Sequence, residues 1–201
     1  VNLDEPSCLC MMGYFCYDGK PYVRRSLRAA CKHFSKAASR GSSAGKYVVG
    51  QMYYNGIHVR KDVEKGETYM NEAADELYAP ALYRRGLIYE RDGDNALAVD
   101  CYYRAAQDEY APALVKMGII SERGEIVARD ENAAFYYFKR AAERESARGC
   151  YGLARCYEQG IGTEISRKKA FEYFKLSATS GYADALLEVG YRYMFGIGTK
   201  K

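Results

Sequence analysis

The sequence predicts an all-α fold, a right-handed superhelical solenoid of about five and a half helix–turn–helix repeats. Two sets of small residues recur along the chain, and self-similarity at a regular period is the mark of such arrays. The first set consists of pairs at spacings of 36, 32, 36 and 36 residues: Ala37-Ala38, Ala73-Ala74, Ala105-Ala106, Ala141-Ala142 and Ser177-Ala178. The second set runs in step with the first: Gly13, Gly50, Gly86, Gly118, Ala154 and Gly190.

We expect the repeats to form one domain over residues 1–201. A single helix pair cannot bury its own apolar face, whereas stacked pairs share a continuous core. The expected repeats cover approximately 5–40, 43–78, 79–110, 111–146, 147–182 and, as a partial sixth, 183–201. The chain begins Val-Asn-Leu-Asp, with neither an initiator Met nor a signal segment, which favours a fragment of a longer protein.

The first helix of each repeat is expected to carry the recurrent small residue. In four repeats an aromatic residue follows three positions later, in the pairs Gly50/Tyr53, Gly86/Tyr89, Ala154/Tyr157 and Gly190/Tyr193. Gly within a helix costs ~1 kcal/mol relative to Ala, so its recurrence needs a packing reason. We expect close approach of a neighbouring helix, with this aromatic ring filling the space one turn later.

The second helix of each repeat is expected to begin after a polar N-cap, because a side-chain oxygen there accepts an N–H group of the first turn. The candidate caps are Asp62, Asp94, Asp130 and Ser166. These helices also carry an aromatic stripe, which is expected to lie in the core. The stripe consists of Tyr69, Tyr102, Tyr103, Tyr136, Tyr137, Phe138, Tyr173 and Phe174. The third repeat lacks four residues in the loop between its helices.

The charge pattern argues against nucleic acid as the partner. Lys and Arg number 30 against 26 Asp and Glu, a net charge of +4, and the basic residues are scattered. Nucleic-acid binders usually concentrate basic residues on one face, because phosphate neutralisation supplies much of their affinity. A nucleic-acid-binding helical-repeat protein stays open as an alternative, since such arrays read bases with a few side chains per repeat. No apolar run reaches the ~18 residues that suit a membrane span.

The cysteines and histidines do not suggest a metal site. The seven cysteines follow no CxxC or Cys/His ligand spacing, and the chain contains only two histidines, His33 and His58. We interpret the cysteines as buried thiols, which favours a reducing intracellular, cytoplasmic compartment.

Catalysis is not expected either. Neither histidine has a Ser, Cys or Asp partner at a diagnostic spacing. The Gly-Ile-Gly segments at 160–162 and 196–198 lack the Lys-Ser/Thr of a phosphate-binding loop and are interpreted as interhelical turns. The sequence therefore predicts no enzyme activity, no cofactor and no small-molecule substrate.

At its recurrent residues the chain resembles the Sel-1-like repeat family, a relative of the tetratricopeptide repeats. The match is clearest in residues 147–182, with Leu153-Ala154, Tyr157, Gly160-Ile161-Gly162, Lys169-Ala170, Tyr173-Phe174 and Ser177-Ala178. The resemblance covers nearly the whole chain, although the paired cysteines of a secreted bacterial branch are missing. It implies adaptor work, because members of this family hold multiprotein complexes together.

The candidate binding surface is the concave side, which the first helices line in related solenoids. Positions three before, and one, four and five after, the recurrent small residue lie at i, i+4, i+7 and i+8, on one helical face. They give the partner-binding candidates Tyr47, Gln51, Tyr54, Asn55, Tyr83, Leu87, Arg91, Ile119, Arg123, Tyr151 and Arg155. Glu90, Val115, Glu122, Glu158 and Gln159 fill further positions of the same pattern.

These candidates predict a protein-interaction scaffold that binds a protein or peptide, because Tyr and Arg are enriched at binding hot spots. Alternatives stay open for each residue type. The tyrosines could serve packing between repeats and not binding. The arginines could pair with the glutamates instead of forming a row of positive charges for an acidic segment. A self-associating structural element is a further alternative, since the partial sixth repeat leaves an apolar end at Met194-Phe195.

Overall fold

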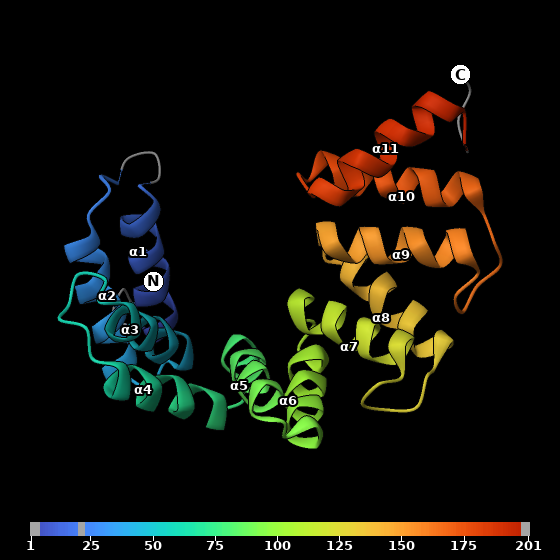
Figure 1. The fold of residues 1–201 in the computed structure, drawn as a ribbon. Helices are drawn as coiled ribbons and strands as arrows, with labels where there is room; N and C mark the ends of the chain where they lie inside the picture. The colour runs from blue at the N-terminus through green and yellow to red at the C-terminus, as the bar shows by residue number, and fades with distance from the viewer. Residues whose placement is uncertain (1–4, 20–22, 198–201) are drawn as a thin grey trace. The chain divides into compact units, whose positions relative to one another are not determined.

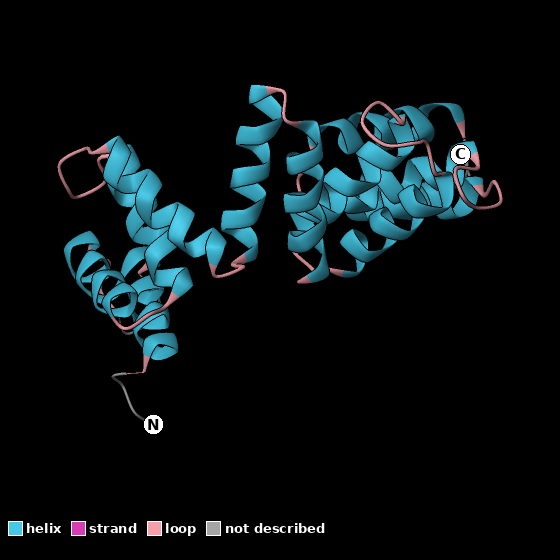
Figure 2. Cartoon of the chain, turned by 90° about the horizontal axis from the view of Figure 1, so that it is seen from below, coloured by secondary structure: helices cyan, strands magenta, loops and turns pink. Residues whose placement is uncertain are grey.

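The computed structural model describes residues 5–19 and 23–197, and over these residues the chain forms eleven α-helices and no strand. The helices are α1 (Pro6–Asp18), α2 (Leu27–Ser39), α3 (Ser43–Asn55), α4 (Val63–Asp75), α5 (Ala79–Asp92), α6 (Asn95–Gln107), α7 (Ala111–Arg123), α8 (Glu131–Glu143), α9 (Ala147–Gln159), α10 (Arg167–Thr179) and α11 (Ala183–Phe195). The predicted all-α repeat fold is confirmed (Figures 1 and 2). Gly198 of the second Gly-Ile-Gly segment lies outside the described residues.

The helices group into two compact units, residues 1–85 and 86–201, with the boundary inside α5. In the first unit α1 packs on α2, α2 on α3, and α3 on α4. In the second unit the same pattern runs from α6 to α11, each helix packing on the next along the chain (Figure 1). Contacts are therefore mostly between neighbours in sequence, as expected for stacked helix pairs.

One contact recurs in the repeats: a large side chain of the second helix lies against the small residue of the first helix. A Cβ built on Gly118 would lie 2.9 Å from the Phe138 ring, and one built on Gly86 would lie 2.6 Å from the Tyr102 ring. Met70 takes the same place against Gly50. The close approach predicted from the small residues is confirmed. The side chain that covers the small residue itself comes from the second helix.

The aromatic rings three positions after the small residue pack against a second aromatic ring on the second helix, beside this contact. Tyr53 stacks on Tyr69, with ring centroids 6.1 Å apart and planes at 3°, and Tyr157 stacks on Tyr173 at 5.7 Å and 10°. Three helical residues advance by roughly 300°, so such a ring sits beside the small residue and not over it. Each of these stacks ties the two helices of one repeat together.

The aromatic stripe of the second helices is only partly in the core. Tyr102, Phe138 and Phe174 are at most 2% exposed, as the sequence predicts. Tyr103 and Tyr136 are 47% and 53% exposed, so their predicted burial is wrong. The helix turns by roughly 100° per residue, and one step along the chain carries a ring from the helix interface to the solvent side.

Three of the four predicted N-caps are confirmed: Asp62, Asp130 and Ser166 accept hydrogen bonds from the backbone N–H groups of Lys65, Ala133 and Lys169. Asp94 precedes α6 but its side chain makes no capping bond. Only Gly93, at φ 91°, and Asp94 separate α5 from α6. This tight turn holds Asp94 at ψ 62°, outside the extended conformation of the other three caps.

The turn between successive repeats contains a residue in the left-handed conformation. Glycine occupies this position at Gly41 and Gly181, whereas Leu77, Glu109 and Glu145 adopt φ angles of 60°, 58° and 57°. The left-handed region costs a non-glycine residue roughly 1–2 kcal/mol because the Cβ crowds the following carbonyl. Three inter-repeat turns therefore hold local backbone strain.

We predict that Phe138→Ala lowers the free energy of unfolding by about 3–5 kcal/mol, because it empties the space against Gly118. Tyr136→Ala removes an exposed ring from the same helix and is expected to cost less than about 1 kcal/mol. Urea denaturation followed by circular dichroism measures both. Equal losses would show that this contact is not the main source of stability in the repeat.

The turn strain gives a second prediction. Glu145→Gly should raise the free energy of unfolding by about 0.5–1 kcal/mol, because glycine relieves the left-handed strain at an exposed position. Glu109→Gly is the matched control: it relieves the same strain but removes a carboxylate that pairs with Arg140 and Arg144. Thermal unfolding of the two variants should therefore separate them, with only the first more stable than wild type.

Candidate functional site

The eleven predicted partner-binding residues all lie on first helices, and none of them is buried. We call this set the first-helix face. It comprises Tyr47, Gln51, Tyr54 and Asn55 on α3; Tyr83, Leu87 and Arg91 on α5; Ile119 and Arg123 on α7; and Tyr151 and Arg155 on α9. Packing against neighbouring helices thus leaves every one of these side chains accessible.

In the first unit, part of this face forms an aromatic hollow of about 300 Å³. We call it the tyrosine hollow. Its lining is Tyr14, Tyr17, Phe34, Tyr47, Val48, Gln51, Met52, Ile57, Tyr78 and Pro80. The Tyr47 ring lies 5.6 Å from the Tyr78 ring, and burial raises the pKa of the Tyr47 hydroxyl. Tyr54 and Asn55 do not line the hollow. The Tyr54 ring instead lies under the Arg84 guanidinium, whose central carbon is 4.9 Å from the centre of the ring.

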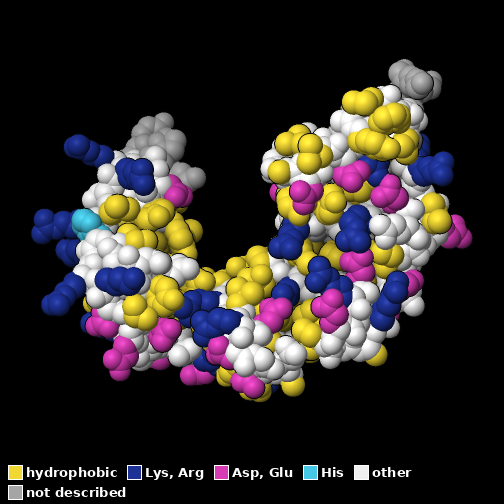
Figure 3. Space-filling view, in the orientation of Figure 1, with side chains coloured by type: hydrophobic (Ala, Val, Ile, Leu, Met, Phe, Trp, Pro, Cys, Tyr) yellow, Lys and Arg dark blue, Asp and Glu magenta, His cyan; other side chains and the backbone are white. Residues whose placement is uncertain are grey.

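In the second unit, four predicted residues meet around a smaller hollow of about 140 Å³. We call it the arginine hollow. Its lining is Val115, Ile119, Glu122, Arg123, Phe138, Arg148, Tyr151, Gly152, Arg155 and Tyr182. The Tyr151 ring packs 5.1 Å from the Tyr182 ring and 5.4 Å from the Phe174 ring. Figure 3 shows basic and acidic side chains interspersed over α7 and α9.

Glutamates on the first helices pair with cations on the first helix of the next repeat. Glu122 lies 2.8 Å from Arg155, and Glu90 lies 2.7 Å from Lys116. Each glutamate stands four residues after the recurrent small residue. Pairing of arginine with glutamate, left open by the sequence, therefore holds for Arg155.

The Glu90 carboxylate of one such pair accepts hydrogen bonds from two protein groups. Burial raises its pKa, but hydrogen bonds from Lys116 and from the Tyr102 hydroxyl, 2.7 Å away, outweigh burial and leave the pKa lowered. The carboxylate therefore stays ionised and continues to hold Lys116.

Arg192 is a structural residue that the sequence reasoning missed. Its side chain is only 4% exposed, and it pairs with both Glu158 and Glu188. Its guanidinium also lies 4.1 Å from the centre of the Phe174 ring. The one available signal was its spacing of 34 residues from Glu158, close to the repeat length.

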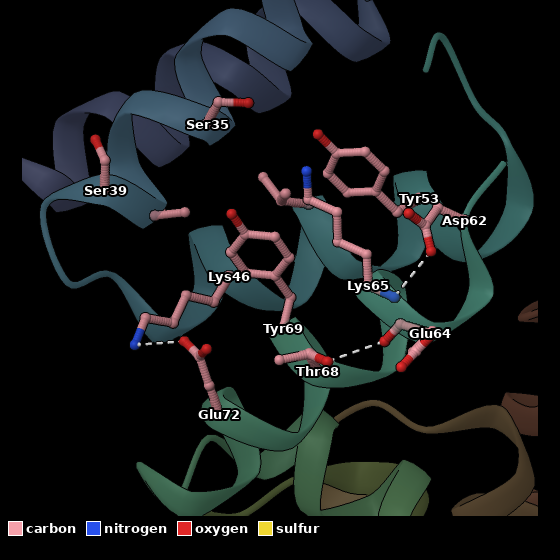
Figure 4. Close-up of a pocket in the computed structure, with 12 residues that line it drawn as sticks. Ser35, Ser39, Lys46, Tyr53, Asp62, Glu64, Lys65, Thr68, Tyr69 and Glu72 are labelled. Carbon is pink, nitrogen blue, oxygen red and sulfur yellow. Dashed lines mark hydrogen bonds and ion pairs between the residues drawn. The ribbon is translucent and has the colours of Figure 1, made fainter. Parts of the chain in front are cut away.

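A third hollow of about 780 Å³ lies in the first unit, between the second helices α2 and α4 and over α3 (Figure 4). The sequence analysis did not predict this hollow. Its two lysines already have partners: Lys46 lies 3.2 Å from Glu72, and the Lys65 ammonium lies 4.3 Å from the centre of the Tyr53 ring. Asp62 caps α4. We therefore do not take this hollow as the functional site.

The Sel1 repeat model matches six segments: residues 6–42, 43–76, 77–110, 111–146, 147–182 and 183–201. Together these segments cover nearly the whole chain. The chain belongs to the Sel1 repeat family.

Solved structures with the same fold support this assignment. A Sel1 repeat protein from Oxalobacter formigenes has a TM-score of 0.76 at 24% identity, covering 96% of this chain and 78% of its own. A protective antigen of uropathogenic Escherichia coli with an SLR fold has a TM-score of 0.75 at 27% identity, covering 98% of this chain. The chain spans 43% of that antigen's length. A search of curated proteins gives no match.

Proteins with Sel1 repeats generally mediate protein–protein interaction, and the fold is a non-catalytic repeat scaffold. Within the described residues, no cluster of three His, Cys, Asp or Glu side chains could hold a metal ion. None of the seven thiols, all of which are described, forms a disulfide, and five are buried. Burial raises the pKa of the Cys156 thiol to about 12. In the described part of the chain, no helix has the length and apolarity needed to cross a membrane.

The inter-repeat pairs of this Sel1 array give a third prediction. Glu158→Gln should lower the free energy of unfolding by about 1–3 kcal/mol, because the buried Arg192 loses one of its two carboxylates. Glu125→Gln is the control, since Glu125 lies 3.9 Å from Arg123 and both are largely exposed. It should change stability by less than about 0.5 kcal/mol. Matching losses in chemical denaturation would show that burial of Arg192 does not matter.

Proposed function

We propose that this chain is an interaction scaffold that binds a peptide or protein partner on the first-helix face, as part of a multiprotein complex. The observation that carries the proposal is the accessibility of all eleven residues of this face. A residue needed only for packing would be expected to be buried in at least some of the repeats. Here four successive first helices present accessible side chains one, four and five positions after the small residue, whereas three positions before it Val115 of α7 is buried and the corresponding tyrosines are not.

The chemistry of the face also supports binding. It combines tyrosines and arginines, which offer large contact area together with hydrogen-bonding groups. Both the tyrosine hollow and the arginine hollow lie on it, so a partner would find concave sites for anchoring side chains in each unit.

The packing of the tyrosines does not argue against this role. Tyr47 contacts Tyr78, which directly precedes α5, and Tyr151 contacts Tyr182, which directly precedes α11. Both rings remain partly exposed. A ring held in place by a neighbour loses little conformational freedom on binding, so packing on one edge prepares the other edge for a partner.

Self-association is a second candidate function, favoured by the surface of α11. Large apolar side chains are exposed there, including Leu187 at 75% and Met194 at 73%, and Figure 3 shows hydrophobic side chains gathered over this helix. Light scattering at two concentrations distinguishes a monomeric scaffold from an associating one. Nucleic acid is not favoured, because Glu90 and Glu122 place negative charge on the same first helices and pair with Lys116 and Arg155.

The proposal predicts that Tyr54→Ala, Tyr83→Ala and Arg123→Ala together abolish partner capture. The matched control combines Tyr103→Ala, Tyr136→Ala and Arg167→Ala, which removes the same residue types from exposed positions on second helices. Capture is measured by affinity purification with this chain as bait and mass spectrometry, and circular dichroism checks that both variants fold. Capture that survives in the first variant, or is lost equally in both, would contradict the assignment of this face.

A further inference from the structure

We propose that the arginine hollow binds an acidic side chain of the partner, placed beside an apolar residue of the same peptide. The inference rests on the proposed function and adds the chemistry of one anchoring position. It follows from the size of the hollow, its uncompensated positive charge and its apolar floor.

The hollow has the scale of one side chain, and a larger open hollow of about 480 Å³ that shares Glu122, Arg123 and Arg155 with it adjoins it. Its 140 Å³ corresponds to about five waters, since each occupies about 30 Å³ in the liquid. A carboxylate side chain with its stem has this scale, whereas a nucleotide or a folded element does not. The hollow is therefore a subsite for a single residue of a longer segment.

Its lining carries three arginines, Arg123, Arg148 and Arg155, against the single carboxylate of Glu122. Glu122 is 2.8 Å from Arg155, so this pair neutralises itself. Arg123 has only Glu125, 3.9 Å away, and both side chains of that pair are more than 60% exposed. Arg148 is exposed and forms no ion pair with the residues that the structure describes. Two guanidinium groups thus remain without a close counterion.

The other glutamates of the first helices cannot supply that counterion, because each is bound elsewhere. Glu90 is held by Lys116 and the Tyr102 hydroxyl, and Glu158 is held by the buried Arg192. The inter-repeat pairs therefore account for these two glutamates, and the Asp184 carboxylate beside the hollow interacts with the Tyr182 hydroxyl. The sequence alone, in which glutamates and arginines simply alternate, does not reveal this imbalance.

The floor of the hollow is apolar. Val115 is 4% exposed and Phe138 is 2% exposed. A Cβ at Gly152 would overlap the Phe138 ring, so α9 lies close over α8 at this point. An apolar floor strengthens attraction between a guanidinium and a carboxylate, and arginine binds carboxylates through two parallel hydrogen bonds. The stem of an acidic residue, or an adjoining apolar residue, would cover the floor.

The tyrosine hollow of the first unit provides an internal contrast. No charged side chain lines it, so it has no preference for an acidic group. The requirement for acid should therefore be a property of the second unit alone.

The test uses a random twelve-residue peptide library displayed on phage and selected against the 201-residue chain. Enriched peptides are synthesised and their Kd values measured by fluorescence anisotropy. The test variant is Arg123→Gln with Arg148→Gln. The matched control is Arg167→Gln with Lys168→Gln, which removes the same charge from exposed positions of α10. Circular dichroism establishes that both variants are folded.

We expect the enriched peptides to share an Asp or Glu beside an apolar residue. Replacing that residue by Asn or Gln should weaken binding about tenfold or more. The test variant should weaken binding of the acidic peptide similarly, but not of its amide form, and the control variant should have no such effect. A phosphoserine form of the peptide is included because a phosphate shares this chemistry. Tighter binding of that form would identify phosphate as the source of the anion.

Two outcomes would overturn the inference in distinguishable ways. Peptides that lose binding on Tyr54→Ala with Tyr83→Ala, yet bind the test variant normally, would refute the acidic subsite and leave the proposed function standing. Peptides unaffected by any first-helix substitution would refute both.

Discussion

The structure depends on one contact, the large side chain of a second helix resting on a small residue of the first. Phe138 on Gly118 and Tyr102 on Gly86 show its form. A larger residue at either glycine would overlap the ring, so the pair of positions sets how closely the two helices of a repeat approach. Once that interface is fixed, the first helix has one side in the repeat core, and its positions one, four and five residues further along remain accessible. The accessibility of the proposed binding face thus follows from the packing constraint.

Charge pairs supply a second regularity along the array. Glu122 with Arg155 and Glu158 with Arg192 link successive first helices, and Tyr54 under Arg84 joins the corresponding helices of the first unit through a cation–π contact. The carboxylates of Glu122 and Glu158 therefore lie close to the first-helix face but are already paired with arginines. What the face offers to a partner is consequently its tyrosines and the arginines outside those pairs.

Much of the fold could be predicted from the sequence because the repeat period is visible in single residue types. Small residues recurring at 36-residue spacing indicate the positions of the first and second helices of a repeat. N-cap residues such as Asp62 and Ser166 indicate where a second helix begins. The side chain that covers each small residue could not be identified from the sequence, because one residue turns the helix by roughly 100°, which the periodicity of residue pairs does not resolve. Burial of Arg192 was invisible, since its environment comes from Glu158 of the preceding repeat and Phe174 of the neighbouring helix. The candidate face was placed by resemblance to related solenoids, and its hollows became apparent only from packing.

The central claim is that a partner contacts the first helices and not the second. Hydroxyl-radical footprinting of the free and partner-bound chain, read by mass spectrometry, tests it at single tyrosines without any substitution. Tyr54, Tyr83 and Tyr151 should become protected in the complex, while the exposed Tyr103 and Tyr136 of the second helices should react as in the free chain. Protection of Tyr103 and Tyr136 with unchanged reactivity of the other three would contradict the account.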